Sequence, residues 1–541
     1  MRPHRLYTTA VVLLLELTTA HAASPPLQGV PNANPKLPGI ASPDILSPEL
    51  RQSAVAQGSF RVENPSGVFE FYGFTADGPH TPAPGALPAA GHLVEATKTE
   101  PDKNTYLVLP GQHGAEAGYD YGRHFLFQGH ESGPDGQGHI TRINLDADGE
   151  HRVTLLASTD SKGAPLPLID GSTWYPWSGR LLFSSEGDGT SSGGIWQATP
   201  DFPSRVEDLL GILGRGGFEG IQADADGNLW IVEDLGGATV SGAKVANSFL
   251  FRFIPKNKRN LAAGGKLQAL QVTKLDHSGP IVFNPGNALT QDAKDLHTYG
   301  NVFDTKWVTV HDSDVDGTAV FNANALAKAK GATPFKRPEN GQFRPGTGFR
   351  QFFFDETGDT SAASTANSGF GGFGSIMKLT QSDPSASAGK LTLFFNCDLT
   401  HDSFDNVAFW DTDHIVFVED RGDTLHTQGN ALDSAWLFDV RKDYSNRVSQ
   451  PVRILAEGRD ALATIDSGFQ GLPGFQNEGD NEITGMHISN GDAGPAGLLG
   501  AQIPRPFTDG WRAFYTQQHG ENATWEILPS GANDDDDHDR R

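Results

Sequence analysis

Cysteine and basic residues are both scarce in this chain. Its 541 residues include one cysteine, Cys397, which excludes an intramolecular disulfide framework and a metal site built from several thiolates. Lysine and arginine total 41 against 66 aspartate and glutamate residues, a formal net charge of −25. This acidic balance disfavours nucleic acid or an anionic membrane as a partner, because both are recognised by basic patches. No segment approaches about 18 consecutive apolar residues, so we expect no membrane span.

The first residues have the pattern of a secretory signal peptide. Arg2 and Arg5 precede an apolar run over residues 10–15, and Ala20-His21-Ala22 is a small-x-small cleavage signature. We therefore predict a signal peptide at 1–22 and an exported protein, periplasmic or extracellular. Exported proteins meet abundant calcium, which suits a chain rich in carboxylates.

Glycine and proline set the expected organisation of the rest. The chain holds 64 Gly and 34 Pro, and short β-like runs recur between Gly, Asp, Asn and Pro. This composition is typical of a turn-rich β protein. We expect a Pro-rich arm or linker at 23–57, one β domain at 58–530 and an acidic tail at 531–541. Helical patterns are few, with one candidate at 321–330.

An internal repeat is the most informative feature. Phe218-Glu219-Gly220-Ile221 leads through an Asp/Gly turn to a strand that ends in Glu233-Asp234, and Phe404-Asp405-Asn406-Val407 leads in the same way to Glu419-Asp420. In both copies the closing Glu lies 14 positions after the first carboxylate. A strand, a tight turn and a return strand form an antiparallel hairpin, so we expect the two carboxylates to meet at one end of it.

Four weaker copies bring the number of repeat units to six. They end or begin at Glu131, Glu186, Glu339 and Glu482. Irregular repeats of this size predict an all-β fold, a β-propeller of about six blades with insertions. The inner strands of a propeller converge on its axis, so carboxylates at equivalent strand ends would form a ring at one mouth.

Such a ring of carboxylates requires cations. Neighbouring carboxylates repel one another and take up protons unless a cation neutralises them. Oxygen-only ligands favour Ca²⁺ or Mg²⁺, with iron or manganese as alternatives. The predicted metal ligands are Glu131, Glu186, Glu219, Glu233, Asp234, Glu339, Asp405, Glu419 and Glu482.

Five segments resemble the PhoX-type secreted alkaline phosphatases, in the order that the family shows. They are Gln128-Gly129-His130-Glu131, the segment from Tyr175-Pro176-Trp177 to Glu186, the segment from Phe218-Glu219-Gly220-Ile221 to Pro255, Arg337-Pro338-Glu339, and the pair Asp405-Asn406 and Glu482-Ile483-Thr484-Gly485 with Gln518-His519. The resemblance extends over about residues 105–525.

The resemblance implies hydrolysis of phosphate monoesters at a central site that holds iron and calcium. It makes Glu131, Glu219, Glu339 and Glu482 the best ligand candidates. Arg337 would contact phosphate, since its planar fork can pair two phosphate oxygens. The resemblance also adds His130, His519 and Asn406 to the expected catalytic group, the two histidines as proton carriers. The expected partner is a small phosphoester substrate of a monomeric enzyme.

The chain departs from the family at the iron site. The family places an iron-ligating Cys before its Thr-Pro-Trp segment, where this chain reads Leu168-Ile169-Asp170-Gly171-Ser172. Asp170 would supply an oxygen in its place, which favours calcium and disfavours iron. Two alternatives stay open: a calcium-dependent hydrolase of another ester or a lactone, and a calcium-binding propeller without enzymatic activity.

Overall fold

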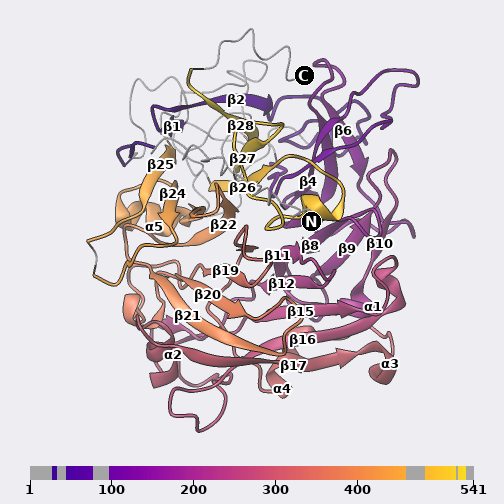
Figure 1. The fold of residues 1–541 in the computed structure, drawn as a ribbon. Coiled ribbons are helices and arrows are strands. Elements are labelled where there is room, and N and C mark those ends of the chain that lie inside the picture. The colour runs from indigo at the N-terminus through magenta and orange to yellow at the C-terminus, as the bar shows by residue number, and fades with distance from the viewer. Residues whose placement is uncertain are drawn as a thin grey trace, which may run out of the picture.

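The computed structural model describes residues 27–32, 44–76, 97–446, 448–457, 482–518 and 522–531. Its sheets are arranged around a centre, and the chain colour runs round the molecule, so that sheets consecutive in sequence are neighbours (Figure 1). The predicted signal peptide, the acidic tail beyond residue 531 and His519 lie outside the described residues.

Most of the described strands form six groups of four antiparallel strands, the first five in meander order. The first group is β3 (Thr105–Val108), β4 (His124–His130), β5 (His139–Asn144) and β6 (Val153–Ala157). The second is β7 (Ser172–Tyr175), β8 (Arg180–Ser185), β9 (Gly194–Ala198) and β10 (Val206–Asp208). The third is β11 (Phe218–Ala223), β12 (Leu229–Glu233), β15 (Leu250–Pro255) and β16 (Gly265–Val272).

The remaining three groups complete the circle. The fourth is β18 (Gly341–Phe343), β19 (Gln351–Glu356), β20 (Ser375–Gln381) and β21 (Ala388–Asn396). The fifth is β22 (Phe404–Phe409), β23 (His414–Glu419), β24 (Ser434–Asp439) and β25 (Val452–Glu457), with β1 (Asp44–Leu46) added at its edge. The sixth is β26 (Glu482–Ser489), β27 (Arg512–Gln518) and β28 (Ala523–Pro529), and its fourth strand is β2 (Leu50–Ala56). The prediction of an all-β propeller is confirmed.

The last group is built from both ends of the chain. Strand β2 pairs antiparallel with β28, from Leu50 opposite Pro529 to Ala56 opposite Thr524. In Figure 1 the indigo β2 lies beside the yellow β28. This pairing closes the circle, so part of the segment expected as a Pro-rich arm supplies strands to the fifth and sixth groups.

The third and fourth groups share one continuous sheet. Strand β17 (Phe303–Asp312) pairs with both β16 and β21 and joins the two groups into nine strands. The insertions carry the small hairpin β13 (Thr239–Val240) and β14 (Ala243–Lys244). They also carry the short helices α1 (Leu210–Leu213), α2 (Gln291–Leu296), α3 (Ser313–Asp316), α4 (Ala323–Ala329) and α5 (Gly422–Gly429). Helix α4 lies within the predicted 321–330 and begins after Asn322, whose side chain accepts from the Ala325 N–H.

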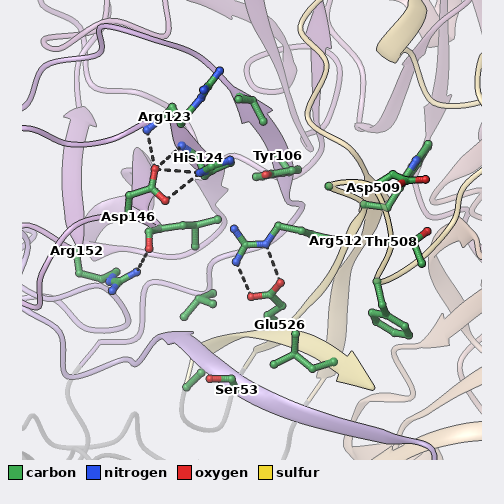
Figure 2. Close-up of a pocket in the computed structure, with 18 of the residues that line it drawn as sticks. Ser53, Tyr106, Arg123, His124, Asp146, Arg152, Thr508, Asp509, Arg512 and Glu526 are labelled. Carbon is green, nitrogen blue, oxygen red and sulfur yellow. Dashed lines mark hydrogen bonds and ion pairs between the residues drawn. The ribbon is translucent and has the colours of Figure 1, made fainter. Parts of the chain in front are cut away.

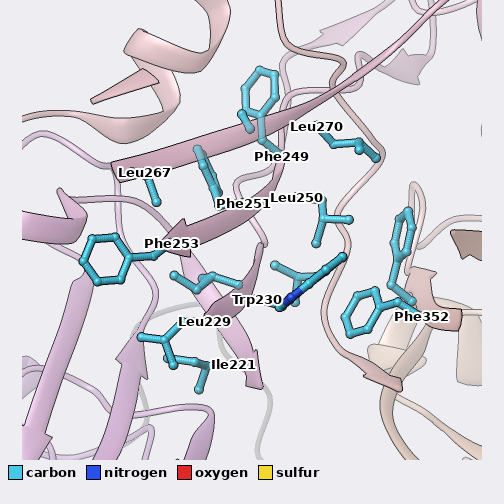
Figure 3. Packing of buried hydrophobic residues seen from close by; sticks show 14 of the residues in the cluster. Ile221, Leu229, Trp230, Phe249, Leu250, Phe251, Phe253, Leu267, Leu270 and Phe352 are labelled. Atoms are coloured by element: carbon cyan, nitrogen blue, oxygen red, sulfur yellow. The ribbon is translucent and has the colours of Figure 1, made fainter. Parts of the chain in front are cut away.

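Large side chains fill the space between neighbouring groups. Trp230 on β12 packs against Phe352 of the fourth group, with ring centres 5.1 Å apart (Figure 3). It also makes edge contacts with Trp307 and Phe343, at ring-centre distances of 5.1 and 4.9 Å. Its Nε1 donates to the buried Asp224 at 2.9 Å, which satisfies the one polar atom of the ring. The tryptophan therefore packs within the core.

Candidate metal centre

Acidic residues stand where the first strand of each group begins. Asp102 and Asp170 precede β3 and β7, Glu339 precedes β18, and Glu219, Asp405 and Glu482 lie in the first two residues of β11, β22 and β26. These starts converge because the six first strands face the centre of the propeller. Gly171 permits one close approach: a Cβ atom there would lie 2.1 Å from the Glu219 carbonyl oxygen.

Seven carboxylates form one connected cluster, which we call the carboxylate cluster. Three overlapping sets each have ligand atoms within 4.8 Å of one another, and they share Asp170 and Glu219: Asp102, Glu131 and Asp170; Asp170, Glu186 and Glu219; and Glu219, Glu339 and Asp405. Glu186 is exposed, Glu131 is partly exposed and the other five are buried. The cluster is therefore reachable from solvent at the Glu131 and Glu186 end.

Without a cation, these groups would hold protons. Burial raises the pKa of Glu131, Asp170, Glu219 and Glu339 well above the usual range, and neighbouring carboxylates raise it further. The pKa of Asp405 rises to about 6 for the same two reasons. The buried Asp170 Oδ1 and Glu219 Oε2 have no hydrogen-bond partner among the described residues. Unpartnered buried carboxylate oxygens in sets of three fit a hard cation such as Ca²⁺.

One cation of the chain itself lies among these acids. Lys103 is 1% exposed, and its Nζ donates to Asn340 Oδ1. Asn340 Nδ2 in turn donates to Glu219 Oε1 at 2.8 Å and to Asp405 Oδ1 at 3.3 Å. Burial lowers the pKa of Lys103, while Asp102, Asp405 and Glu219 act to raise it. Lys103 thus supplies one positive charge within the carboxylate cluster.

Arg337 lies beside the carboxylate cluster and is held rigidly. Its Nε and Nη2 donate to both oxygens of Asp234 at 2.6–3.0 Å, and Nη2 lies 3.1 Å from Glu339 Oε1. The Arg337 backbone has φ +55°, a left-handed conformation that is strained for a non-glycine residue. Its side chain stays 20% exposed, and Nη1 has no hydrogen bond or ion pair in the part of the chain that the structure describes. One edge of the guanidinium therefore remains available to an anion.

Glu233 and Glu419 do not join the carboxylate cluster. Phe218 pairs directly with Glu233 and Phe404 with Glu419, each beside a β-bulge, so Glu219 and Asp405 sit one residue out of register. Because side chains alternate along a strand, each closing Glu points away from its expected partner. The prediction that the carboxylates of each hairpin meet is therefore wrong.

These two glutamates have other partners. Glu233 Oε2 accepts from Asn324 Nδ2 at 2.8 Å and from the Phe249 N–H at 3.1 Å. Glu419 forms a buried ion pair with Arg421 at 3.2 Å. Asp234, the residue after Glu233, points the other way and binds Arg337. Both glutamates are therefore engaged outside the carboxylate cluster.

The remaining predicted catalytic residues are placed as follows. His130 is buried, with Nδ1 3.1 Å from Thr99 Oγ1 and Nε2 2.8 Å from Thr141 Oγ1. Burial lowers its pKa to about 3, so the ring is neutral, and both ring nitrogens contact threonine hydroxyls, which makes it a structural residue and not the expected proton carrier. Asn406 Nδ2 donates to both oxygens of Asp405 at 3.0 Å, which orients that carboxylate. Glu482 is partly buried opposite Gln518, outside the three sets.

Sequence reasoning missed Asp102 and Lys103. Both precede a short strand in the first group, where no repeat motif marks the position. The signal that could have found them is the place of an acid just before the first strand of a unit, which Asp102 shares with Asp170 and Glu339. Asp170, expected to replace the family's cysteine as an oxygen donor, belongs to two of the three sets.

Comparison with known proteins supports the predicted resemblance. The family described as alkaline phosphatase PhoX matches residues 237–435. Among solved structures, PhoX of Pseudomonas fluorescens in complex with vanadate, a transition state analogue, is similar at 12% identity and a TM-score of 0.52, covering 93% of this chain and 98% of that one. Sqt1 from Chaetomium thermophilum is similar at 12% identity and a TM-score of 0.33, covering 75% and 80%. No curated protein matches the sequence.

The match over residues 237–435 confirms the resemblance to the PhoX-type family, and the Pseudomonas structure confirms the propeller fold. Within the described residues, no helix is long and apolar enough to cross a membrane.

Proposed function

We propose that this protein is an exported, calcium-dependent phosphatase of the PhoX kind that hydrolyses phosphate monoesters at the carboxylate cluster. The observation that carries the proposal is the position of Arg337, with one free guanidinium edge, beside the Glu219, Glu339 and Asp405 set. The family match over residues 237–435 includes Arg337, Glu339 and Asp405. A cationic fork next to a cation-binding carboxylate set suits a phosphate group.

The proposed cation ligands are Asp102, Glu131, Asp170, Glu186, Glu219, Glu339 and Asp405. All their donor atoms are oxygens, and Asp170 stands where the family has its iron-binding Cys, so calcium is the ion we propose. When bound, calcium ions would neutralise the phosphoryl oxygens and lower the pKa of a coordinated water.

The residues of the chain would bind and orient the substrate. Arg337 binds phosphoryl oxygens through Nη1, while Asp234 holds the other edge of its guanidinium in place. Asn340 and Asn406 keep Glu219 and Asp405 oriented, and Lys103 offsets part of the negative charge that would repel a phosphate. His519, outside the described residues, stays our candidate for proton transfer to the leaving oxygen.

The test combines metal analysis with assay of one variant pair. Purified protein should contain calcium, hydrolyse 4-nitrophenyl phosphate, lose this activity on chelation and regain it with Ca²⁺. Arg337→Ala should lower kcat/KM by about 100-fold or more, since the charge-assisted contact from Nη1 to the phosphoryl group is lost. Arg259→Ala, an exposed arginine on the β15–β16 connection, is the matched control. The phosphatase proposal would be contradicted, in favour of another calcium-dependent hydrolase, if Arg337→Ala kept full activity or if the protein hydrolysed carboxylic esters alone. Purified protein without any bound metal would refute the metal centre.

The proposal includes export with removal of residues 1–22, and action as a monomer. Amino-terminal sequencing and light scattering of the secreted protein test these two points.

A further inference from the structure

A second site lies at the opposite end of the strands. A cavity of about 900 Å³ opens between the first and last groups, which we call the seam pocket. Val108, the last residue of β3, and Arg512, the first of β27, line it, whereas Asp102 precedes β3 and Glu482 lies opposite the last residue of β27. The seam pocket is therefore separate from the carboxylate cluster.

Asp146, a carboxylate in the lining, fixes the first donor of the seam pocket. Asp146 accepts from the backbone N–H groups of Arg123 and His124, at 2.7 and 3.1 Å, and lies 2.9 Å from His124 Nδ1 (Figure 2). Burial opposes ionisation of Asp146, but these hydrogen bonds lower its pKa to about 2. With Nδ1 engaged, Nε2 of the His124 ring is the nitrogen left for a ligand.

Glu526 fixes the second donor in the same way. It accepts from Nε and Nη2 of Arg512 at 2.7 and 2.5 Å, a bidentate pair in which Nη1 takes no part. The Arg512 guanidinium also lies 5.6 Å from the Tyr106 ring and 5.2 Å from the Phe514 ring. Its direction is therefore set before any ligand arrives.

Arg123 adds a positive charge to the seam pocket that no described carboxylate neutralises. Its side chain is exposed, and its guanidinium makes no hydrogen bond or ion pair with any described residue. The acidic residues of the seam pocket already have partners: Asp146 accepts from two backbone N–H groups and lies beside His124 Nδ1, Glu526 pairs with Arg512, and Asp509 lies 3.7 Å from Arg505. The seam pocket thus presents cationic donors and no unpaired carboxylate.

Part of the pocket lining is apolar and conformationally constrained. It includes Leu145, Phe507, Trp511 and Leu528. Phe507 and Asp509 have φ values of 74° and 51°, so two non-glycine residues in one short loop are left-handed. Phe507 packs on the buried Trp410 at 5.7 Å, which holds this loop in place. Strained backbone beside a cavity is typical of binding sites.

We propose that the seam pocket binds an organic anion with an aromatic or aliphatic body, with the anionic group at Arg123, His124 and Arg512 and the body against Phe507 and Trp511. The volume falls within the range for organic ligands and exceeds what an inorganic ion fills. This site is independent of the proposed phosphatase activity.

The probe for the test is 1-anilinonaphthalene-8-sulfonate, with the neutral N-phenyl-1-naphthylamine as its uncharged counterpart, titrated by fluorescence into chelated full-length protein. Arg123→Gln removes the unpaired charge. Gly149→Phe fills the seam pocket, because Gly149 lines it and a Cβ atom there meets no atom within 4 Å. The matched controls are Arg259→Gln and Gly286→Phe, both exposed positions on other groups.

We expect the sulfonate to bind the unchanged protein and both controls equally, and to bind Arg123→Gln and Gly149→Phe about tenfold more weakly or worse. The neutral probe should bind less tightly than the sulfonate and be insensitive to Arg123→Gln. Equal sulfonate affinity across all five proteins, no sulfonate binding to the unchanged protein, or equal loss of both probes in Arg123→Gln would overturn the proposal. 4-Nitrophenyl phosphate hydrolysis by metal-loaded Arg123→Gln should match that of Arg259→Gln, which separates this site from the carboxylate cluster.

Discussion

Glu233 and Glu419 occupy the same place in two repeats, yet replacing each by glutamine should change stability in opposite directions. Glu233 is fully buried, and its pKa rises to about 8 because burial disfavours the charged form, despite hydrogen bonds from Asn324 and the Phe249 N–H. In the unfolded chain its pKa is the usual 4.5. The folded state therefore binds a proton that the unfolded state releases at neutral pH.

The sign and the size of the stability change follow from this difference between the folded-state and unfolded-state pKa of Glu233. A raised folded-state pKa contributes stability that is complete below pH 4.5 and is lost as the pH rises through about 8. At pH 7 the ionisable carboxyl costs about 3 kcal/mol relative to a neutral side chain, and at pH 5 about 1 kcal/mol. Glu233→Gln should therefore stabilise the protein by up to about 3 kcal/mol at pH 7, a rise in Tm of about 3 °C for a chain of this length.

Glu419→Gln is the matched comparison. Its carboxylate pairs with the buried Arg421, so the neutral amide leaves that guanidinium with less compensation and should cost about 2–3 kcal/mol. Thermal unfolding at pH 5, 7 and 8, followed by circular dichroism, measures both effects, and calcium content measures any role in the metal centre. A lower Tm or a loss of bound calcium in Glu233→Gln would refute the separation of Glu233 from the carboxylate cluster.

Three other outcomes are expected. Chelation should lower Tm, and Ca²⁺ at about 100 times its Kd should restore about 2.7 kcal/mol of stability. Glu219→Gln should weaken calcium binding, measured by this stabilisation, at least tenfold, while the exposed Glu150→Gln should leave it unchanged. Equal stabilisation of the two variants by calcium would exclude Glu219 as a ligand. Lys103→Met should destabilise the calcium-free protein by about 2 kcal/mol more than the calcium-loaded protein, because the ion compensates for the missing charge; an equal loss in both would mean that Lys103 serves packing alone. Trp230→Phe should cost about 1–3 kcal/mol in denaturant unfolding by leaving the buried Asp224 without a donor, with no change in calcium content, and a neutral result would show that water replaces the indole.

The repeats allowed the fold to be predicted because a hairpin has a strong local signature. The Phe-acid-x-β-branched start and the Glu-Asp end recur around Phe218 and Phe404. Each copy forms the predicted antiparallel hairpin, and both hairpins carry a bulge at the same place. The same pattern could not tell Glu233 from Asp234, since a one-residue shift in register turns a side chain to the other face. Lys103 could not be predicted either, because its importance comes from acids that lie far along the chain and meet only in the closed circle.

The pairing of β2 with β28 has a consequence for how this chain reaches its native state. Residues 50 and 529 must meet before the circle closes, so the sixth group cannot form until almost the whole chain has been synthesised. Contacts over such a separation slow folding, and β26 to β28 stay without their fourth strand until then. Because Thr484 of the sixth group donates a hydrogen bond to Asp102 of the carboxylate cluster, closure of the circle also completes the contacts that hold this carboxylate. Cation binding at the proposed site would then favour ring closure.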